Sequence, residues 1–359
     1  MGDFSIALEQ CIMQKGKSAT AGSKILENFI APYDAEIVTR LERKNVQIPI
    51  RTEMDEFGIG RTFSKEEILS PSIEAVANGK ANFALCNDVF GMQRRQAPAS
   101  GLSYIYPSYG TVSRYGLIPL ASSMDQIGIV CKNAAEGFRL LSNFSGSDPK
   151  DGAMYAEKSY TYVRQNRPLK IGIPSTIVSR TNEGMQNAIT QFGKKFESVN
   201  IELNYFDLFK QVLHILAYAE ISNNINRYDG MKFGYRTKEY KNIADIYLKS
   251  RTEGFGLDAK LAAIMGTIVL SREQYLPYYE QAMKLRRLIQ ESLQFDQYDL
   301  IVLPLWISEN LYENSSLFAL SPLVGLPSIS FAHQGHGIQL IANARFENAL
   351  LTAWEVARS

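Results

Sequence analysis

Short buried strands alternate with amphipathic helices along this chain, which restricts the folds it can adopt. The segment LKIGIP at residues 169–174 is apolar enough for a buried strand, and apolar residues from Met185 to Phe196 then recur at helical spacing. Residues 201–205 alternate between apolar and polar side chains, as a strand with one buried face does. This order predicts a βαβ unit, and therefore parallel strands covered on both faces.

The same pattern continues toward the C-terminus. Residues 272–293 predict one long helix, and YDLIVLPL at residues 298–305 predicts a buried strand. GLPSISF, GIQLIA and the helical pattern FENALLTAWEVA follow. With 45% hydrophobic residues in 359, the chain can bury a large core. We therefore predict an α/β fold, with a central mixed, largely parallel sheet covered by helices on both faces.

The overall charge and the cysteines narrow the class of protein. The formal net charge is +1, so no global electrostatic field recruits nucleic acid or an anionic membrane. No apolar run approaches the roughly 20 residues that span a bilayer. The N-terminal segment lacks the features of a signal peptide, and the three cysteines are far apart. We expect a cytoplasmic protein without direct nucleic-acid or membrane contact.

A sharp turn is predicted at residues 87–96, NDVFGMQRRQ, which follow the apolar run FALC. Such an elbow exposes the nucleophile in many α/β enzymes, but here Met92 stands at its tip. A thioether has no proton to lose and is a poor acyl carrier. The two histidines of HQGH at 333–336 do not provide a metal site instead, because they lack the spacing of metal ligands. We expect no metal and no cofactor.

Several segments together resemble a known family. They are KGKSATAGSKILENFIAPYDAEIV, MDEFGIG, PSYGTVSRYGLIPLASSMDQIG, NNINRYDGMKFGYR and RTEGFGLDAKLAAIMGTIVLS. In this order they resemble the amidase signature family, and within it the A subunits of bacterial tRNA-dependent amidotransferases. The similarity runs from about Ile6 to Arg358. It implies a single amidase-like domain over residues 1–359, without the family's N-terminal helical region and with shortened loops.

The resemblance also implies where catalytic residues should lie. The family uses a lysine, a serine on a cis peptide and a nucleophilic serine. In this chain the lysine position falls on Glu9 of IALEQCI, the bridging serine on Ile68 and the nucleophile on Met92. We therefore expect no intact member of the family's catalytic triad. At the elbow, Asp88 and Gly91 are retained, whereas Phe90 replaces a glycine.

The implied substrate pocket is altered as well. Tyr228 is retained, but Leu261 and Ala262 replace the paired arginines that hold the glutamine carboxylate in the family. The acid that pairs with the substrate amine falls on Ser315. Losing one partner of a desolvated charge pair costs roughly 2 to 5 kcal/mol, so this pocket should bind glutamine poorly.

Three interpretations follow. We favour a catalytically silent paralogue that acts by protein contact in or near the transamidation machinery. Its partners would be the B or C subunit of an amidotransferase, or another amidase-like chain. The second is an active amide hydrolase, or the glutamine-amidase component of an amidotransferase, with relocated catalytic residues, for which the candidate nucleophiles are Ser70, Ser72 and Ser103. The third is a small-molecule sensor that uses the old amidase pocket.

Overall fold

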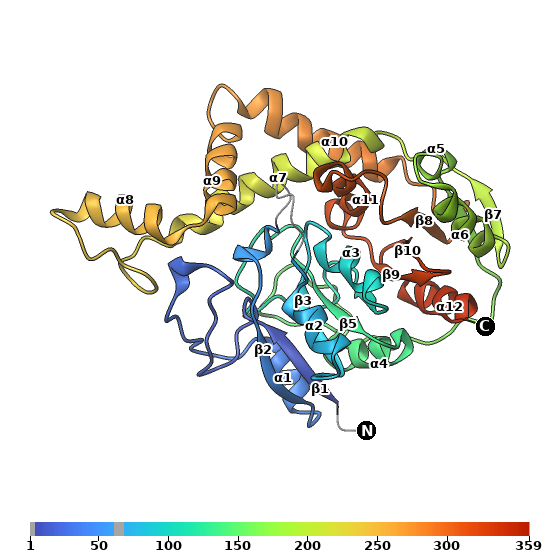
Figure 1. Ribbon diagram of the computed structural model, residues 1–359, viewed down its shortest axis with the longest axis horizontal. Coiled ribbons are helices and arrows are strands. Elements are labelled where there is room, and N and C mark those ends of the chain that lie inside the picture. Colours follow the sequence, from blue (N-terminus) through green and yellow to red (C-terminus); the bar gives the residue numbers. More distant parts are fainter. Residues whose placement is uncertain (1–3, 61–67, 359) are drawn as a thin grey trace.

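A single mixed sheet organises the chain (Figure 1). The computed structural model describes residues 4–60 and 68–358, and within them ten strands form this sheet in the order β2-β1-β3-β5-β4-β9-β10-β8-β6-β7. The strands are β1 (Ser5–Glu9), β2 (Gln47–Thr52), β3 (Phe83–Asn87), β4 (Ser103–Tyr106), β5 (Ile127–Cys131), β6 (Lys170–Ile173), β7 (Glu197–Asn200), β8 (Leu300–Pro304), β9 (Ser328–His333) and β10 (His336–Ala342).

Helices cover both faces of the sheet, as predicted for the α/β class (Figure 1). α2 and α3 pack on one face, and α4 and α12 pack on the other. The helices are α1 (Glu36–Glu42), α2 (Pro71–Ala77), α3 (Met92–Ala99), α4 (Ala134–Phe144), α5 (Ser175–Val178), α6 (Glu183–Gly193), α7 (Phe209–Asn224), α8 (Ile243–Gly254), α9 (Leu257–Val269), α10 (Gln281–Glu291), α11 (Leu311–Val324) and α12 (Glu347–Arg358).

Alternate side chains of β3 pack into the hydrophobic clusters on the two faces of the sheet. Ala84 and Cys86 join the cluster beneath α2 and α3. Phe83 and Leu85 join the larger cluster, which includes Phe138 of α4 on the opposite face. Successive side chains of a strand point to opposite faces, so a strand that is apolar at nearly every position is buried on both sides. All five residues of β3 are buried.

Parallel pairing is concentrated toward the two ends of the sheet. β1 pairs in parallel with β2 and β3, and β6 pairs in parallel with β7 and β8. The five pairs between β3 and β8 are antiparallel. The predicted βαβ unit is confirmed by β6, α6 and β7. The mixed sheet is also confirmed, with its parallel character limited to the end regions.

Two element predictions were wrong in detail. Residues 201–205 do not form a strand: β7 ends at Asn200, and Tyr205 has a φ of 65°. β7 is a largely exposed edge strand, so its own residues show no apolar alternation to mark it. The long helix predicted at residues 272–293 begins instead with a π-helical segment at Tyr275–Glu280, and α10 follows.

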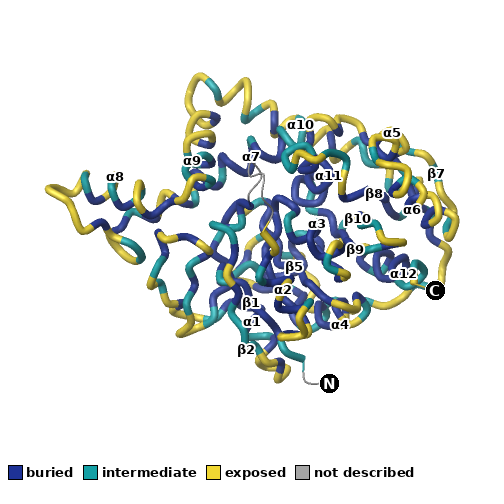
Figure 2. Tube along the Cα trace, in the orientation of Figure 1, coloured by how far each residue is buried: buried dark blue, intermediate teal, exposed yellow. Residues whose placement is uncertain are grey.

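α8 and α9 project away from the sheet (Figures 1 and 2). Ala259, Ala262 and Gly266 of α9 are buried against α7 and its surroundings. On the opposite side of the helix, Leu257, Ile264 and Ile268 are exposed. Their successive spacings of seven and four residues place them on one face of the helix. We refer to Leu257, Ile264 and Ile268 as the α9 stripe.

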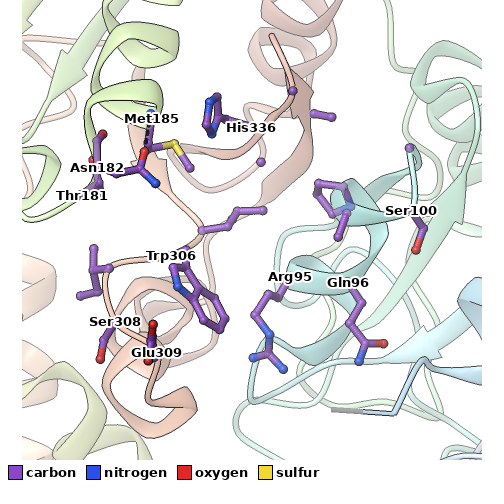
Figure 3. A pocket seen from close by; sticks show the side chains of 18 of the residues that line it. Arg95, Gln96, Ser100, Thr181, Asn182, Met185, Trp306, Ser308, Glu309 and His336 are labelled. Carbon is purple, nitrogen blue, oxygen red and sulfur yellow. Dashed lines mark hydrogen bonds between the residues drawn. The ribbon is translucent and has the colours of Figure 1, made fainter. Parts of the chain in front are cut away.

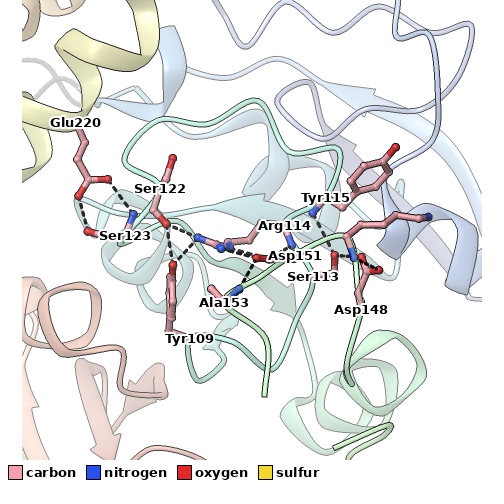
Figure 4. A network of polar contacts seen from close by, with 11 residues as sticks. Tyr109, Ser113, Arg114, Tyr115, Ser122, Ser123, Asp148, Asp151, Ala153 and Glu220 are labelled. Atoms are coloured by element: carbon pink, nitrogen blue, oxygen red, sulfur yellow. Dashed lines mark hydrogen bonds and ion pairs between the residues drawn. The ribbon is translucent and has the colours of Figure 1, made fainter. Parts of the chain in front are cut away.

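A polar network fixes the long segment between β4 and β5 (Figure 4). Arg114 forms an ion pair with Asp151 at 2.6 Å and donates a hydrogen bond to the hydroxyl of Tyr109 at 2.6 Å. Farther along the segment, the backbone N–H of Ser123 donates to the carboxylate of Glu220 on α7 at 2.9 Å. The segment is therefore attached both to the loop after α4 and to α7.

The structure also shows the state of the cysteines and allows a search for membrane-spanning helices and metal sites. All three cysteines are free and buried. Across residues 4–60 and 68–358, no helix combines the length and apolar character needed to cross a membrane. The same described residues contain no group of three or more His, Cys, Asp or Glu side chains that could hold a metal ion.

Candidate active site

The elbow predicted at residues 87–96 is present between β3 and α3. The strand ends at Asn87, the chain turns at Gly91, and the helix begins at Met92. Gly91 has a φ of 86°, and a Cβ atom added there would lie 2.2 Å from Cγ of Phe318. Any other residue would meet both backbone strain and that ring, so the turn requires glycine.

A buried ion pair holds the elbow in place. The carboxylate of Asp88 accepts hydrogen bonds from the backbone N–H groups of Gln93 and Arg94, each at 3.1 Å. The side chain of Arg94 is fully buried and pairs with the same carboxylate at 3.0 Å. Arg94 also donates to the carbonyl oxygen of Phe318 at 2.8 Å, and its guanidinium lies 4.6 Å from the centre of the Tyr106 ring. These contacts fix the start of α3 relative to α11.

Glu9, at the end of β1, is a buried carboxyl group beside the elbow. Its Oε2 accepts a hydrogen bond from the backbone N–H of Asn87 at 3.0 Å and lies 3.4 Å from Sγ of Cys11. Its Oε1 accepts from Nε2 of Gln93 at 3.3 Å. Burial disfavours the charged form and raises the pKa of Glu9 to about 8, although the Asn87 hydrogen bond lowers it. This carboxyl group therefore titrates near physiological pH.

Two glutamines on one face of α3 connect Glu9 to the segment before α2. Nε2 of Gln93 donates both to Glu9 and to the hydroxyl oxygen of Ser70, the latter at 2.9 Å. One turn later, Oε1 of Gln96 accepts from the backbone N–H of Ser70 at 2.8 Å. Nε2 of Gln96 donates to the carbonyl oxygen of Ile68, also at 2.8 Å. Ser70 is thus held beside the elbow through both its backbone and its side chain.

The three candidate serines lie in different surroundings. Ser70 shares Gln93 with Glu9, so its hydroxyl belongs to the site. The hydroxyl of Ser72, on α2, lies 2.8 Å from that of Thr52 and is buried. Ser103 is buried in β4, and its hydroxyl has no hydrogen-bond partner among the described residues. Of the three, the structure joins only Ser70 to Glu9 by way of Gln93.

Asn87 links Glu9 to a second buried acid. While its backbone N–H binds Glu9, its side-chain nitrogen donates to Oδ1 of Asp125 at 2.8 Å. Its side-chain oxygen accepts from the backbone N–H of Gln126 at 3.0 Å. Burial raises the pKa of Asp125 to about 6, and the hydrogen bond from Asn87 opposes that rise. Asn87 is therefore held from three sides.

Two of the pocket positions that the resemblance implies, Phe90 and Tyr228, pack against other aromatic rings. The ring of Phe90 lies 5.3 Å from that of His214 and 6.1 Å from that of Tyr218, both on α7. Burial lowers the pKa of His214 to about 4, so this imidazole is neutral at physiological pH. Tyr228 stacks on Phe57 with ring centres 5.5 Å apart. These rings make the region apolar.

The remaining pocket positions carry no charge. Ala262 is buried where α9 packs, and Leu261 beside it is partly buried. Ser315 lies on α11, where its hydroxyl donates to the carbonyl oxygen of Leu311 at 3.4 Å. That these are the family's substrate-binding positions, and that Glu9, Ile68 and Met92 occupy the triad positions, stays a prediction.

Sequence reasoning missed Asn87, Gln93 and Gln96. The one local signal was the spacing of the two glutamines, which places them on the same face of a helix. Nothing in that spacing shows that Glu9 and Ser70 lie opposite them.

Comparison with known proteins gives one clear family. The family model described as Amidase matches residues 5–68 and 72–315. The A subunit of the glutamyl-tRNA(Gln) amidotransferase of Lachnoclostridium phytofermentans is 34% identical over 368 residues, covering 90% of this chain and 74% of that protein. The protein of the same name from Nitrosomonas europaea is 37% identical over 329 residues, covering 83% of this chain and 67% of that protein.

Solved structures share the fold. The A subunit of the Thermotoga maritima glutamyl-tRNA(Gln) amidotransferase superimposes with a TM-score of 0.77 at 24% identity, covering 97% of this chain and 81% of that chain. The peptide amidase of Stenotrophomonas maltophilia gives 0.76 at 20% identity, covering 99% and 83%.

These comparisons contradict our interpretation of the chain as a catalytically silent protein. The relatives that are 33 to 37% identical carry the name of an amidotransferase component, so an enzyme with relocated catalytic residues agrees better with them. The expectation that the chain is not an enzyme was wrong for the same reason. It rested on the substituted triad and pocket positions and did not foresee that Gln93 connects Glu9 to Ser70.

Proposed function

Because the chain belongs to the amidase family, we propose that it hydrolyses amides with Ser70 as nucleophile and Glu9 as general base. One observation carries this assignment: the carboxylate of Glu9 and the hydroxyl of Ser70 accept hydrogen bonds from the same nitrogen of Gln93. A hydroxyl is a weak nucleophile until a base takes its proton, and here a base and a hydroxyl face a common side chain.

The raised pKa makes Glu9 a stronger base than an ordinary carboxylate. With a pKa of about 8, roughly half of the molecules carry the ionised form at pH 8. A proton can pass from the Ser70 hydroxyl to this carboxylate through one water molecule, because both oxygens border the same amide group. Gln93 orients the pair and does not itself exchange the proton.

The reaction then proceeds in two stages. The Ser70 oxygen bonds to the amide carbon while its proton moves to Glu9. The amide nitrogen takes that proton and leaves as ammonia, so an ester to Ser70 remains. Water then attacks the ester, passing a proton to Glu9, and the ester bond breaks as Ser70 regains its hydrogen. The products are a carboxylic acid and ammonia.

Glutamine is the amide we propose, since the relatives are named as components of glutamyl-tRNA(Gln) amidotransferase. Their name describes one part of a larger enzyme, and we propose that this chain also works beside other subunits, the B or C subunit first among them. The α9 stripe supports a protein partner, because its apolar side chains are exposed. We place this work in the cytoplasm, where aminoacyl-tRNA is used.

The test is ammonia release from L-glutamine by the purified chain, made in a host without its own amidotransferase, alone and with B and C subunits. Ser70→Ala should abolish turnover, because loss of a nucleophile costs on the order of a millionfold. Ser103→Ala is the matched control, since its hydroxyl has no partner among the described residues and lies outside the site. Equal activity of wild type and Ser70→Ala would remove Ser70 from the mechanism.

A further inference from the structure

A cavity of about 490 Å³ lies near the C-terminal end of α12. Its walls come from the segment before β6, from the turn between α6 and β7, and from α12, which lie at the same end of the molecule (Figure 1). The volume is in the range of small-molecule sites, roughly 300 to 1,000 Å³. None of the residues that line it belongs to the elbow or to the proposed catalytic pair. We refer to it as the basic cavity.

The lining of the basic cavity is strongly positive. It contains one carboxylate, Glu197, and four cationic side chains, which are Arg164, Arg167, Lys194 and Lys195. Glu197 is already paired with Lys170 outside the cavity, at 3.0 Å. Because the whole chain has a formal net charge of only +1, this cluster is a local feature that attracts anions.

A larger cavity beside α3, of about 960 Å³, has no comparable excess of positive charge (Figure 3). Arg95 and Glu309 both line it. Its second arginine, Arg180, is paired with Asp207 at 2.6 Å. The concentration of cations is thus specific to the basic cavity.

Two of the four cations keep donors for a ligand. Lys194 is exposed, and its ammonium group has no ion pair or hydrogen bond among the described residues. Arg164 lies 3.7 Å from Glu355, which is beyond hydrogen-bond distance, and its side chain is 57% exposed. The guanidinium of Arg164 therefore presents its planar set of N–H donors to the cavity without a protein acceptor among the described residues.

The other two cations are held by the chain and add to the charge. Arg167 pairs with Asp299 at 2.5 Å. The ammonium group of Lys195 donates to the carbonyl oxygens of Val356 and Ala357, each at 3.1 Å. These contacts fix the positions of the two side chains and of the last turn of α12.

Gln165 adds a buried acceptor to the lining. Its backbone N–H donates to the hydroxyl of Thr352 at 2.8 Å, which holds the residue against α12. Its side-chain Oε1 is buried and has no hydrogen-bond partner among the described residues. Buried polar atoms are nearly always paired, so an occupant with an O–H group would satisfy this oxygen. Leu169 and Phe196 supply the apolar part of the lining.

We infer that the basic cavity binds a small phosphate monoester whose organic part carries hydroxyl groups. Arg164 and Lys194 bind the phosphate, since a guanidinium fork and an ammonium group are the side chains that suit this doubly charged group. Gln165 accepts a hydrogen bond from a hydroxyl of the organic part. Phe196 and Leu169 contact its apolar surface.

The first experiment is calorimetric titration of the full chain with ribose 5-phosphate and with adenosine 5′-monophosphate. We expect at least one of them to bind, and Lys194→Gln and Arg164→Gln each to weaken that binding at least tenfold. Lys80→Gln is the charge-matched control, because Lys80 is an exposed lysine outside the cavity, and it should bind as the wild type does. Binding should also weaken as the salt concentration rises.

Ligands that lack one part of the ester give a sharper test. Inorganic phosphate has no organic part, so Gln165→Met should not change its binding, whereas this substitution should weaken the binding of the ester. Ribose lacks the phosphate and should not bind. Citrate carries carboxylates in place of phosphate, and binding of citrate as tight as that of the ester overturns the assignment to phosphate.

Two further outcomes overturn the inference. One is equal binding of the ester by the wild type, Lys194→Gln and Arg164→Gln at unchanged melting temperature. The other is the absence of binding by both esters. If a 5′-phosphorylated RNA oligonucleotide binds where neither ester does, the phosphate comes from a nucleic acid and the small-molecule assignment is wrong.

The inference is independent of the proposed function. Lys194→Gln should release ammonia from L-glutamine at the wild-type rate, because Lys194 lies outside the site of Glu9 and Ser70. Likewise, Ser70→Ala should bind the ester as the wild type does.

Discussion

Glu9 is a buried carboxyl group whose burial and hydrogen bonds shift its pKa in opposite directions. It is buried at the end of β1, yet it accepts hydrogen bonds from a backbone N–H and from a side-chain amide. Burial dominates and raises its pKa to about 8 from an ordinary value of 4.5. The folded chain therefore retains a proton that the unfolded chain releases between these two pH values.

This retention makes folding stability depend on pH. Between about pH 4.5 and 8 the folded state binds more protons at Glu9 than the unfolded state, so the contribution of Glu9 to the free energy of unfolding falls as pH rises. The slope is about 1.4 kcal/mol per pH unit. Because other groups titrate too, urea unfolding of wild type should be compared with Glu9→Gln at several pH values. The stability advantage of the variant should grow from pH 5 to 8 and then level off; a constant difference would contradict the raised pKa.

The same group should shape the pH profile of catalysis. If ionised Glu9 is the general base, kcat/KM for L-glutamine hydrolysis should rise about tenfold per pH unit below pH 8 and level off above it. Glu9→Gln should lower kcat by about 100-fold to 10,000-fold at pH 8. A rate that is independent of pH between 6 and 9 would exclude Glu9 as the base.

At single positions, the sequence predicted well what depends on local geometry. The turn at Gly91 was expected and is found between β3 and α3. That Asp88 is a retained family position stays a prediction. Gln93 was not expected, because its role requires β1, α3 and the segment before α2 to converge. Its partners Glu9 and Ser70 are 84 and 23 residues away in sequence, distances over which local patterns carry no information.

α3 depends on Arg94 for its orientation. The buried guanidinium reaches the carboxylate of Asp88, the carbonyl of Phe318 and the face of Tyr106 at once. Lysine has one charged nitrogen and cannot reproduce this planar set of contacts. The helix that carries both site glutamines is thus fixed by the residue that follows Gln93.

Arg94→Lys should therefore destabilise the fold. We expect a loss of about 3 to 5 kcal/mol, as when a buried ion pair loses its geometry. Arg287→Lys is the control, because that arginine is exposed and pairs with Glu291 on the same helix. Urea unfolding measures both. Equal midpoints for the two variants would show that the Asp88 pair does not hold the elbow.

Buried secondary-structure elements were predicted from the sequence more accurately than exposed ones, because burial produces an apolar pattern. β3, β8, α6 and α12 carry strong apolar patterns and were predicted. β7 lies at the edge of the sheet with mostly exposed side chains, and the strand was wrongly predicted at residues 201–205. The π-helical segment Tyr275–Glu280 has no buried residue among those described, so no apolar face marked its irregular turn.

In the molecule as a whole, α9 is apolar on two opposite faces. One face packs on α7 through Ala262 and Gly266. The other presents Leu257, 81% exposed, and Ile264, 58% exposed. A helix that is apolar all round is normally buried, so the α9 stripe supports the proposal that another protein covers it.

Charged residues in the α9 stripe should separate assembly from folding. Ile264→Glu combined with Ile268→Glu should reduce recovery of the B and C subunits with the tagged chain by at least tenfold. The melting temperature should stay within about 2 °C, because both side chains are exposed in the isolated chain. Thr267→Glu, on the same helix beside the stripe, is the matched control. Undiminished recovery would mean that the partner binds elsewhere.

The two faces of α9 also imply two different histories under natural selection. At Gly266 a Cβ atom would lie 2.0 Å from the carbonyl oxygen of Tyr218, so a larger residue there would clash with the backbone of α7. Ile264 is exposed among the residues that the structure describes, so its apolar side chain would be selected by the proposed partner. In a lineage that lost the partner, a few neutral substitutions would make the α9 stripe polar. Gly266 would persist for as long as the chain folds.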